Sequence, residues 1–254
     1  MIALTTPVGP VDAPLLLLGP SLGTSTILWE DVIPQLTDTY RVAAWDLPGH
    51  GAAPAASGPF TVADLADAVA AAAPDDTFFF AGVSLGGATG LELALRHGHR
   101  VRGAAILASG AQLGDPTAWA ERAAQARAQS TSSLLVASAQ RWFAPESPAR
   151  RPDLTGRLLH ALQNADDDSY ARCCEALAAY DVRGRLGEIT VPVLAAWGEF
   201  DAVAPEAKAV EIAERVRDGR VVRIADAGHL PPAEQPDAVA AMLRAFFASE
   251  EETR

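Results

Sequence analysis

The sequence predicts an α/β fold, with a mostly parallel sheet flanked by helices and interrupted by an inserted helical lid. Three observations lead to this prediction. Short continuous apolar runs alternate with segments of helical periodicity. The stretch 115–185 contains no strand-like run. Motifs with candidate catalytic residues directly follow several of the predicted strands. A chain of 254 residues is long enough to bury a large core as one domain with an insertion.

Six apolar runs of four or five residues are the candidate strands. They are Leu15–Leu18, Val42–Trp45, Phe78–Ala81, Ala104–Ala108, Val193–Trp197 and Val221–Ile224. Continuous rather than alternating apolar runs are typical of strands covered on both faces, as in a parallel sheet.

Helical segments separate these runs. Thr61–Ala73 begins with T-V-A-D, which is typical of a helix capping box. Ser84–His97 and Pro236–Ala248 have helical apolar spacing, and a further helix is expected after V-A-P at 203–205. The final SEEETR is expected to form a frayed tail.

The stretch between the fourth and fifth candidate strands is predicted to be a lid. It is rich in Ala, Arg, Gln and Leu and is punctuated by Pro116, Pro145, Pro148 and Pro152, which favours several short helices. An insertion at this point lies over the carboxyl ends of the strands, where open α/β sheets bind ligands. We therefore expect a core domain of residues 1–114 and 186–254 and a helical lid of residues 115–185.

Composition excludes several classes of partner. The net charge of −12 argues against nucleic acid and anionic membrane, and an anionic small molecule would need a local cation. No apolar run approaches the roughly 20 residues that span a bilayer. The start of the chain lacks the regions of a secretory signal, so a cytoplasmic location is expected. The adjacent Cys173 and Cys174 have no metal-ligand spacing and are expected in a buried helix.

Ser84 is the predicted nucleophile. It lies in G-V-S-L-G, directly after a candidate strand and at the start of a helical segment. A serine at such a corner has strained backbone angles, and Gly82 and Gly86 are needed because their neighbours approach too closely for a Cβ. The corner exposes Oγ beside the N–H of Leu85 at a helix N-terminus. The alternative is an N-cap serine in a glycine-rich turn.

A serine hydroxyl needs a base, and His229 is the predicted one. It lies in A-D-A-G-H-L-P-P after the last candidate strand, as the chain order serine, acid, histidine requires. His50, in D-L-P-G-H-G, is interpreted as a structural turn residue, with a catalytic role as the alternative. His97 and His99 are expected at the surface.

Asp201 is the predicted acid, because it lies in G-E-F-D after the fifth candidate strand. Glu199 of the same motif is the alternative, and Ser109–Ala111, after the preceding strand, contains no carboxylate. The turn L-G-P-S-L-G-T after the first strand is expected to supply a second N–H, from Leu22, which with the N–H of Leu85 forms an oxyanion hole.

The motifs D-L-P-G-H-G, G-V-S-L-G-G, G-E-F-D and A-G-H, in this order, resemble the α/β-hydrolase superfamily across the whole chain. S-L-G-T followed by Trp29, R-W-F at 141–143 and Y-A-R-C-C-E-A-L at 170–177 resemble the 3-oxoadipate enol-lactonases of aromatic catabolism. Two departures are visible. Pro20 stands where that family usually has Asn or His, and A-V-A-P replaces the end of its G-x-x-D-x-x-T-P.

The resemblance implies a carboxylic-ester hydrolase that opens 3-oxoadipate enol-lactone to 3-oxoadipate, through an acyl-enzyme or by direct attack of water, without metal or organic cofactor. The substrate carboxylate requires a cation, since an unpaired charge in a dry pocket is costly. Arg141 is favoured because it adjoins Trp142, which resembles the family's lid tryptophan, and Arg127 is the main alternative. The insertion offers further arginines, most of which are expected to be solvated: Arg122, Arg150, Arg151, Arg157 and Arg172. A general carboxylesterase, a perhydrolase, a carbon–carbon hydrolase and a non-catalytic small-molecule receptor remain alternatives.

Overall fold

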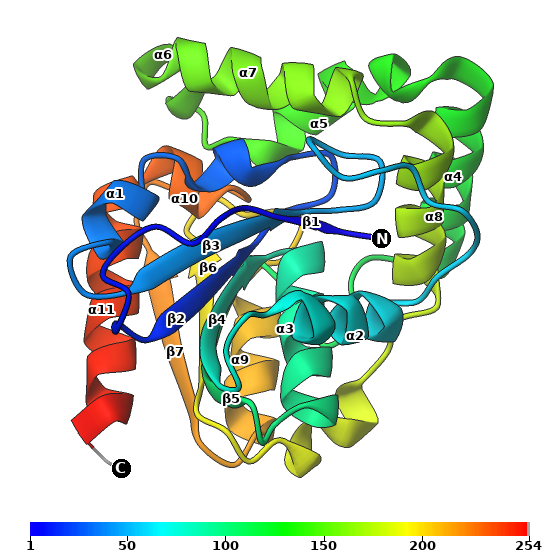
Figure 1. Ribbon diagram of the computed structural model, residues 1–254. Helices are drawn as coiled ribbons and strands as arrows, with labels where there is room; N and C mark the ends of the chain where they lie inside the picture. Colours follow the sequence, from blue (N-terminus) through cyan, green and yellow to red (C-terminus); the bar gives the residue numbers. More distant parts are fainter. Residues whose placement is uncertain (253–254) are drawn as a thin grey trace.

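The computed structural model describes residues 1–252, which form a seven-stranded sheet in the order β1-β3-β2-β4-β5-β6-β7 (Figure 1). The strands are β1 Ala3–Leu4, β2 Leu15–Gly19, β3 Arg41–Asp46, β4 Phe78–Val83, β5 Val101–Leu107, β6 Val193–Gly198 and β7 Gly219–Ile224. Among residues 1–252, five neighbouring strand pairs are parallel and the β1–β3 pair is antiparallel. The predicted fold class and all six predicted strands are confirmed. The two-residue β1 was not predicted.

Helices cover both faces of the sheet. α1 (Ile33–Leu36) packs against α11 (Pro236–Glu252), and α2 (Val62–Ala72) packs against α3 (Leu85–Arg96) on the other side (Figure 1). α3 also contacts β2, β4 and β5. The remaining elements of this part are the 3₁₀ helix η1 (Thr26–Trp29), α9 (Glu206–Arg215) and α10 (Pro231–Glu234). Coverage on both faces explains why the central strands are apolar throughout.

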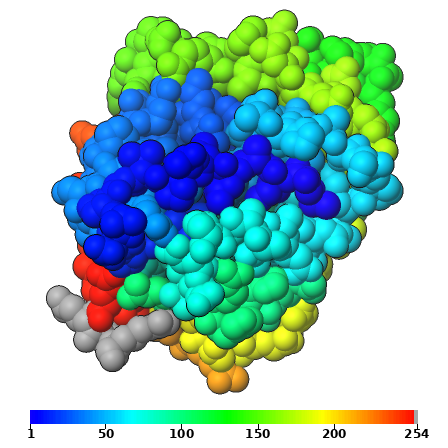
Figure 2. All heavy atoms as spheres, in the orientation of Figure 1, coloured from blue at the N-terminus to red at the C-terminus, as the bar shows by residue number. Residues whose placement is uncertain are grey.

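The stretch between β5 and β6 consists of helices joined by turns and contains no strand, as predicted. It contains α4 (Pro116–Gln129), η2 (Thr131–Leu134), α5 (Leu135–Trp142), α6 (Ser147–Arg150), α7 (Pro152–Gln163), α8 (Asp167–Ala178) and η3 (Arg183–Glu188). Helices α4 to α8 gather above and beside the sheet, and in the space-filling view they form a continuous layer at the top (Figures 1 and 2). We call residues 115–185 of this stretch the helical insertion. Cys173 and Cys174 are buried in α8, and burial raises the pKa of both thiols.

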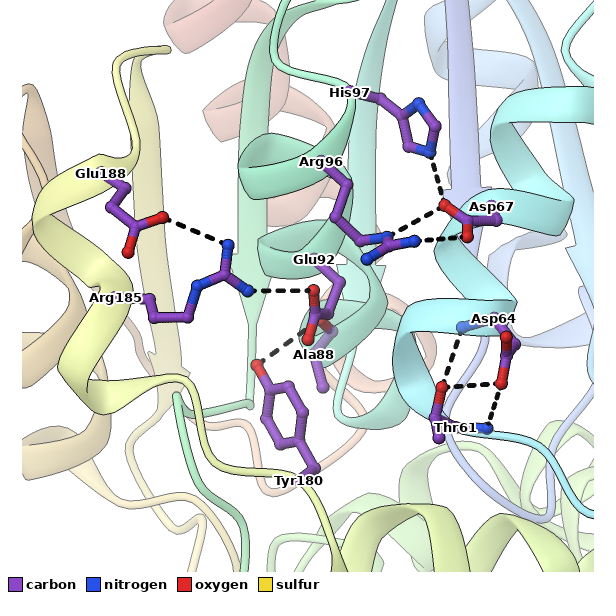
Figure 3. Close-up of polar contacts among 10 residues, drawn as sticks. All are labelled: Thr61, Asp64, Asp67, Ala88, Glu92, Arg96, His97, Tyr180, Arg185 and Glu188. Atoms are coloured by element: carbon purple, nitrogen blue, oxygen red, sulfur yellow. Dashed lines mark hydrogen bonds and ion pairs between the residues drawn. The ribbon is translucent and has the colours of Figure 1, made fainter.

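Of two predictions about helix ends, one is confirmed and the other is wrong. The capping box of α2 is confirmed, because Thr61 Oγ1 accepts the N–H of Asp64 while the Asp64 carboxylate accepts the N–H of Thr61 (Figure 3). The expected frayed tail is wrong for its described part. Helix α11 continues to Glu252, and the buried Glu250 pairs with Arg220 at 2.8 Å. Residues 253–254 lie outside the described residues.

Within residues 1–252, no helix has both the length and the apolar character needed to cross a membrane.

Candidate active site

Ser84 lies at a strained corner between β4 and α3. Its φ of 55° and ψ of −113° place it in a region that non-glycine residues rarely occupy. A Cβ on Gly82 would lie 2.4 Å from the carbonyl carbon of Gly86, and one on Gly86 would lie 2.6 Å from the Pro20 oxygen. Both glycines are therefore required, as expected. Ser84 occupies the N-cap position of α3 but its side chain makes no capping bond, so its hydroxyl remains available.

Asp201 and His229 form a buried pair at the carboxyl edge of the sheet. Nδ1 of His229 lies 3.0 Å and 3.1 Å from the two Asp201 carboxylate oxygens. Oδ1 of Asp201 also accepts the N–H groups of Val203 and Ala204, at 2.8 Å and 3.0 Å. Burial opposes ionisation of Asp201, but His229 and these two donors outweigh it and lower the pKa of the carboxyl. An ionised Asp201 accepts the Nδ1–H of His229, which leaves Nε2 as the basic nitrogen.

Glu199, the alternative acid, points elsewhere. Its carboxylate pairs with Arg223 at 3.2 Å and accepts the N–H of Asp226 at 3.2 Å on the exposed side of the loop. The structure therefore brings Asp201, and not Glu199, to His229. Among the described residues, no three His, Cys, Asp or Glu side chains are grouped in a way that could hold a metal ion.

The two predicted oxyanion donors lie beside Ser84. Leu85 is the first residue of α3, and Leu22 lines the same cavity as Ser84. Neither backbone N–H donates to any other group within residues 1–252, so both can donate to a ligand. The N–H of Gly86 donates to the Pro20 oxygen at 2.9 Å. The turn that contains Pro20, where this sequence departs from the enol-lactonase pattern, is thus joined by a hydrogen bond to α3, the helix that follows Ser84.

His50 has a structural role that supports this turn. Its ring is buried, its Nδ1–H donates to the Pro48 oxygen at 2.9 Å, and its Nε2 accepts the N–H of Gly23 at 3.3 Å. Burial lowers the pKa of His50 to about 4, so the ring is neutral at pH 7 and Nε2 remains an acceptor. The hydrogen bond to Gly23 holds the residue directly after Leu22. The His50 ring also stacks on the Tyr170 ring, with 6.0 Å between their centroids. His50 therefore holds the turn that contains Leu22 and Gly23, and both of its ring nitrogens are engaged.

Ser84 and His229 open into one cavity of about 250 Å³. The helical insertion supplies much of the remaining wall, through Trp119, Arg122, Arg141, Trp142 and Tyr170. A pocket with aromatic walls and a few converging polar groups is typical of a small-molecule site.

Two arginines in this cavity have no carboxylate partner among the described residues. Arg122 donates to the Tyr170 hydroxyl at 2.7 Å and to Ser138 Oγ at 2.8 Å, and Arg141 donates to the Ala137 oxygen at 3.2 Å. Burial, followed by the nearby Arg122 cation, lowers the pKa of Arg141. Two cations without a counter-ion beside a candidate nucleophile form a site that can bind an anion.

Arg127 does not lie in this cavity, which corrects the sequence-based expectation for this residue. It is exposed and forms ion pairs with Asp168, at 2.9 Å, and with Glu175. Its charge is therefore already neutralised on the surface of α4 and α8. Five further arginines of the helical insertion also pair with carboxylates: Arg151, Arg157, Arg172, Arg183 and Arg185.

The sequence analysis missed the support behind the Ser84 corner. Ser109 is buried after β5, and its Oγ–H donates to the Ser84 carbonyl oxygen at 2.7 Å. A Cβ on Gly87 would lie 2.5 Å from the Ser109 Cβ, so α3 and this turn are in close contact. Ser109 carries no recognisable motif, because its partner depends on β5 lying next to β4 in the sheet.

Comparison with known proteins places this geometry in a family. Residues 14–236 match the model of the α/β-hydrolase fold. The chain belongs to the α/β-hydrolase fold family. This match covers most of the chain and agrees with the parallel sheet and with the nucleophile-type corner at Ser84.

Relatives of this α/β-hydrolase include enol-lactonases and esterases. The chain is 33% identical over 247 residues to 3-oxoadipate enol-lactonase 2 of Acinetobacter baylyi, covering 94% of the chain and 91% of the relative. It is 34% identical to the pimeloyl-[acyl-carrier protein] methyl ester esterase of Neisseria meningitidis, covering 88% and 73%. The solved enol-lactonase from Burkholderia xenovorans LB400 has a TM-score of 0.93 at 31% identity, covering 97% and 96%. The resemblance to the enol-lactonases is confirmed.

Proposed function

We propose that this α/β-hydrolase is a serine hydrolase that opens the ring of 3-oxoadipate enol-lactone through Ser84, His229 and Asp201. One observation carries the proposal. The candidate nucleophile and base share a single small cavity with Arg122 and Arg141, two cations that lack carboxylate partners. A small ester that bears its own carboxylate matches this combination. The relatives named as enol-lactonases support the same substrate class.

The proposed reaction begins when His229 Nε2 takes the Ser84 proton as Oγ bonds to the lactone carbonyl carbon. The oxyanion accepts the N–H groups of Leu22 and Leu85, each worth about 3–4 kcal/mol in comparable sites. The bond to the ring oxygen then breaks, and the protonated His229 gives its proton to the departing enolate oxygen. The resulting enol is still part of the acyl chain and tautomerises to a ketone. His229, neutral again, takes a proton from water as that water attacks the acyl-enzyme carbonyl, and return of this proton to Oγ regenerates Ser84 and releases 3-oxoadipate.

The helical insertion, residues 115–185, acts in this proposal as a lid over a core of residues 1–114 and 186–254. The core supplies the triad and the oxyanion donors, whereas the lid supplies Arg122, Arg141 and Trp142. Enclosing the substrate excludes water, which strengthens the attraction between its carboxylate and the arginines.

A second candidate is a carboxylesterase for open-chain esters. The observation that favours it is the 34% identity to a methyl ester esterase, similar to the identity to the enol-lactonase relative. Both reactions would use the same triad, so the difference lies in the alcohol that leaves.

A hydrolysis screen tests the proposal. The purified protein is assayed with 3-oxoadipate enol-lactone, with monomethyl esters of dicarboxylic acids and with neutral p-nitrophenyl esters. We expect the highest kcat/KM for the enol-lactone. Preference for the monomethyl esters would establish the second candidate instead, and no turnover of any substrate would contradict both and indicate a binding protein.

A further inference from the structure

Glu234, the last residue of α10, is a buried carboxylate surrounded by donors. It is 8% exposed. Oε1 accepts the N–H groups of Gly228 and Leu230 at 2.8 Å and 3.2 Å, while Oε2 accepts the N–H of Ala144 and the hydroxyl of Ser147, both at 2.7 Å. Three of the four partners are backbone donors. Burial raises the pKa of the Glu234 carboxyl, and the four hydrogen bonds oppose that rise because they favour the ionised form. Glu234 therefore joins two separate segments of the chain.

One of these segments carries the proposed base. Gly228 and Leu230 are the neighbours of His229, whose own N–H donates to the Trp142 oxygen at 2.9 Å. Three consecutive N–H groups of the loop 228–230, the histidine loop, therefore end on Glu234 or Trp142. The contacts with Asp201 orient the imidazole ring of His229, whereas these backbone hydrogen bonds fix the position of the main chain that carries the ring.

The other segment carries part of the cavity wall. It runs from Trp142, at the end of α5, to Ser147, at the start of α6, and we call it the wall segment. The two segments meet backbone to backbone, since a Cβ on Gly228 would lie 2.7 Å from the Ala144 nitrogen and 2.9 Å from the Trp142 oxygen. The carboxylate of Glu234 thus fixes the position of the histidine loop relative to the wall segment.

We propose that Glu234 is a positioning residue for catalysis, which fixes His229 relative to the substrate wall at Trp142 by bridging the histidine loop and the wall segment. The inference rests on the proposed function. A general base must lie within hydrogen-bond reach of the proton that it takes. Removing the bridge lets the histidine loop and the wall separate, and a displacement of about 1 Å can cost on the order of 100-fold in rate.

The test is the rate and the end point of Ser84 labelling by a fluorophosphonate probe, because this reaction also needs His229 as base. Glu234→Gln keeps the size and shape of the side chain but replaces one carboxylate oxygen by an NH₂ group. This group is a donor and would face the N–H and O–H donors that the oxygen accepts in the wild type. We expect it to label about 10- to 100-fold more slowly than the wild type, yet to reach full occupancy. With p-nitrophenyl acetate, kcat should fall by a similar factor while KM stays within about twofold.

The matched control is Glu250→Gln. Glu250 is also a buried glutamate, but it pairs with Arg220 of β7, and neither residue lines the cavity. This variant should lose stability and still label at the wild-type rate. Should Glu234→Gln not fold, Ser147→Ala removes a single bond of the bridge and should slow labelling about threefold.

The outcomes separate the two proposals. If the wild type is not labelled at Ser84, the proposed function fails. If the wild type is labelled but Glu234→Gln, or Ser147→Ala in its place, reacts at the wild-type rate, the positioning role is wrong. A normal rate with a reduced end point in Glu234→Gln also overturns it, because that result describes a fold that is only partly populated.

Discussion

Two histidine–aspartate pairs in this protein have similar distances but different surroundings. Nε2 of His97, the residue after α3, lies 2.7 Å from Asp67 of α2 (Figure 3), and Nδ1 of His229 lies 3.0 Å from Asp201. The side chains of the first pair are 25% and 42% exposed, whereas those of the second are 3% and 0% exposed. Arg96 also donates two hydrogen bonds to Asp67, but no arginine contacts Asp201 among the described residues.

A histidine–carboxylate contact does not by itself make the histidine a catalytic base. His97 uses Nε2 for the contact, and its carboxylate is shared with Arg96, so the pair is a surface ion-pair cluster. His229 uses Nδ1, is surrounded by protein and faces a cavity that also contains Ser84. Burial and a nearby nucleophile, rather than the pair, distinguish the candidate active site.

The largest effect is expected at the serine. Ser84→Ala should lower turnover by about 10⁴-fold or more, because the remaining groups cannot supply a nucleophile. The circular dichroism spectrum and thermal midpoint should stay close to those of the wild type. His97→Asn is the control and should retain full activity. Full activity in Ser84→Ala, or probe label on another residue, would show that the nucleophile is misassigned.

The next effect separates the acids. Asp201→Asn should lower kcat by roughly 10³–10⁴, because the amide no longer holds His229 in the required tautomer. Glu199→Gln and Asp67→Asn should change kcat by less than about twofold, since both carboxylates lie on the exposed surface. Steady-state kinetics with one ester substrate rank the three variants. A larger loss in Glu199→Gln than in Asp201→Asn would reverse the assignment.

A smaller effect is expected at the cavity cations. Arg141→Met and Arg122→Met should each raise KM for the anionic lactone by about 10- to 100-fold, because a charge-assisted bond contributes about 1.5–3 kcal/mol. KM for a neutral p-nitrophenyl ester should change little. Arg127→Met is the matched control from the same insertion. If neither cavity arginine affects the anionic lactone, its carboxylate is bound elsewhere and the enol-lactonase proposal loses its main support.

The smallest effect concerns the surface pair. Hydrogen bonds from Arg96 and then His97 lower the pKa of Asp67 from 3.8 to about 2. A lowered folded-state pKa means that this cluster stabilises the fold above the ordinary pKa of 3.8 and loses its contribution as pH falls through about 2. Asp67→Asn should therefore lower the melting temperature slightly at pH 7, and the difference from the wild type should shrink between pH 4 and 2. The difference should also shrink in high salt, because the pair is exposed. A difference that does not shrink between pH 4 and 2 would mean that Asp67 stabilises the fold by another contact.

Much of the fold could be predicted from local patterns. The six apolar runs became strands because continuous hydrophobic runs of this length suit a sheet that helices cover on both faces. Strand β1 escaped prediction, since two residues at the edge of a sheet leave no pattern. The end of α11 was misjudged because the ion pair of Glu250 with Arg220, far away in the sequence, decides whether that turn is stable.

By itself, the sequence determined the corner at Ser84 and the order of serine, acid and histidine, because glycines and turn residues act through their own backbone and immediate neighbours. Which groups outside those motifs reach the candidate site depends instead on the packing of distant segments. Arg122, Arg127 and Arg141 occur in similar sequence surroundings, and the packing of α4 against α8 directs Arg127 outward, where carboxylates neutralise it. The support by Ser109 and the bridge by Glu234 depend likewise on strand order and on the contact of two distant loops, which no local pattern encodes.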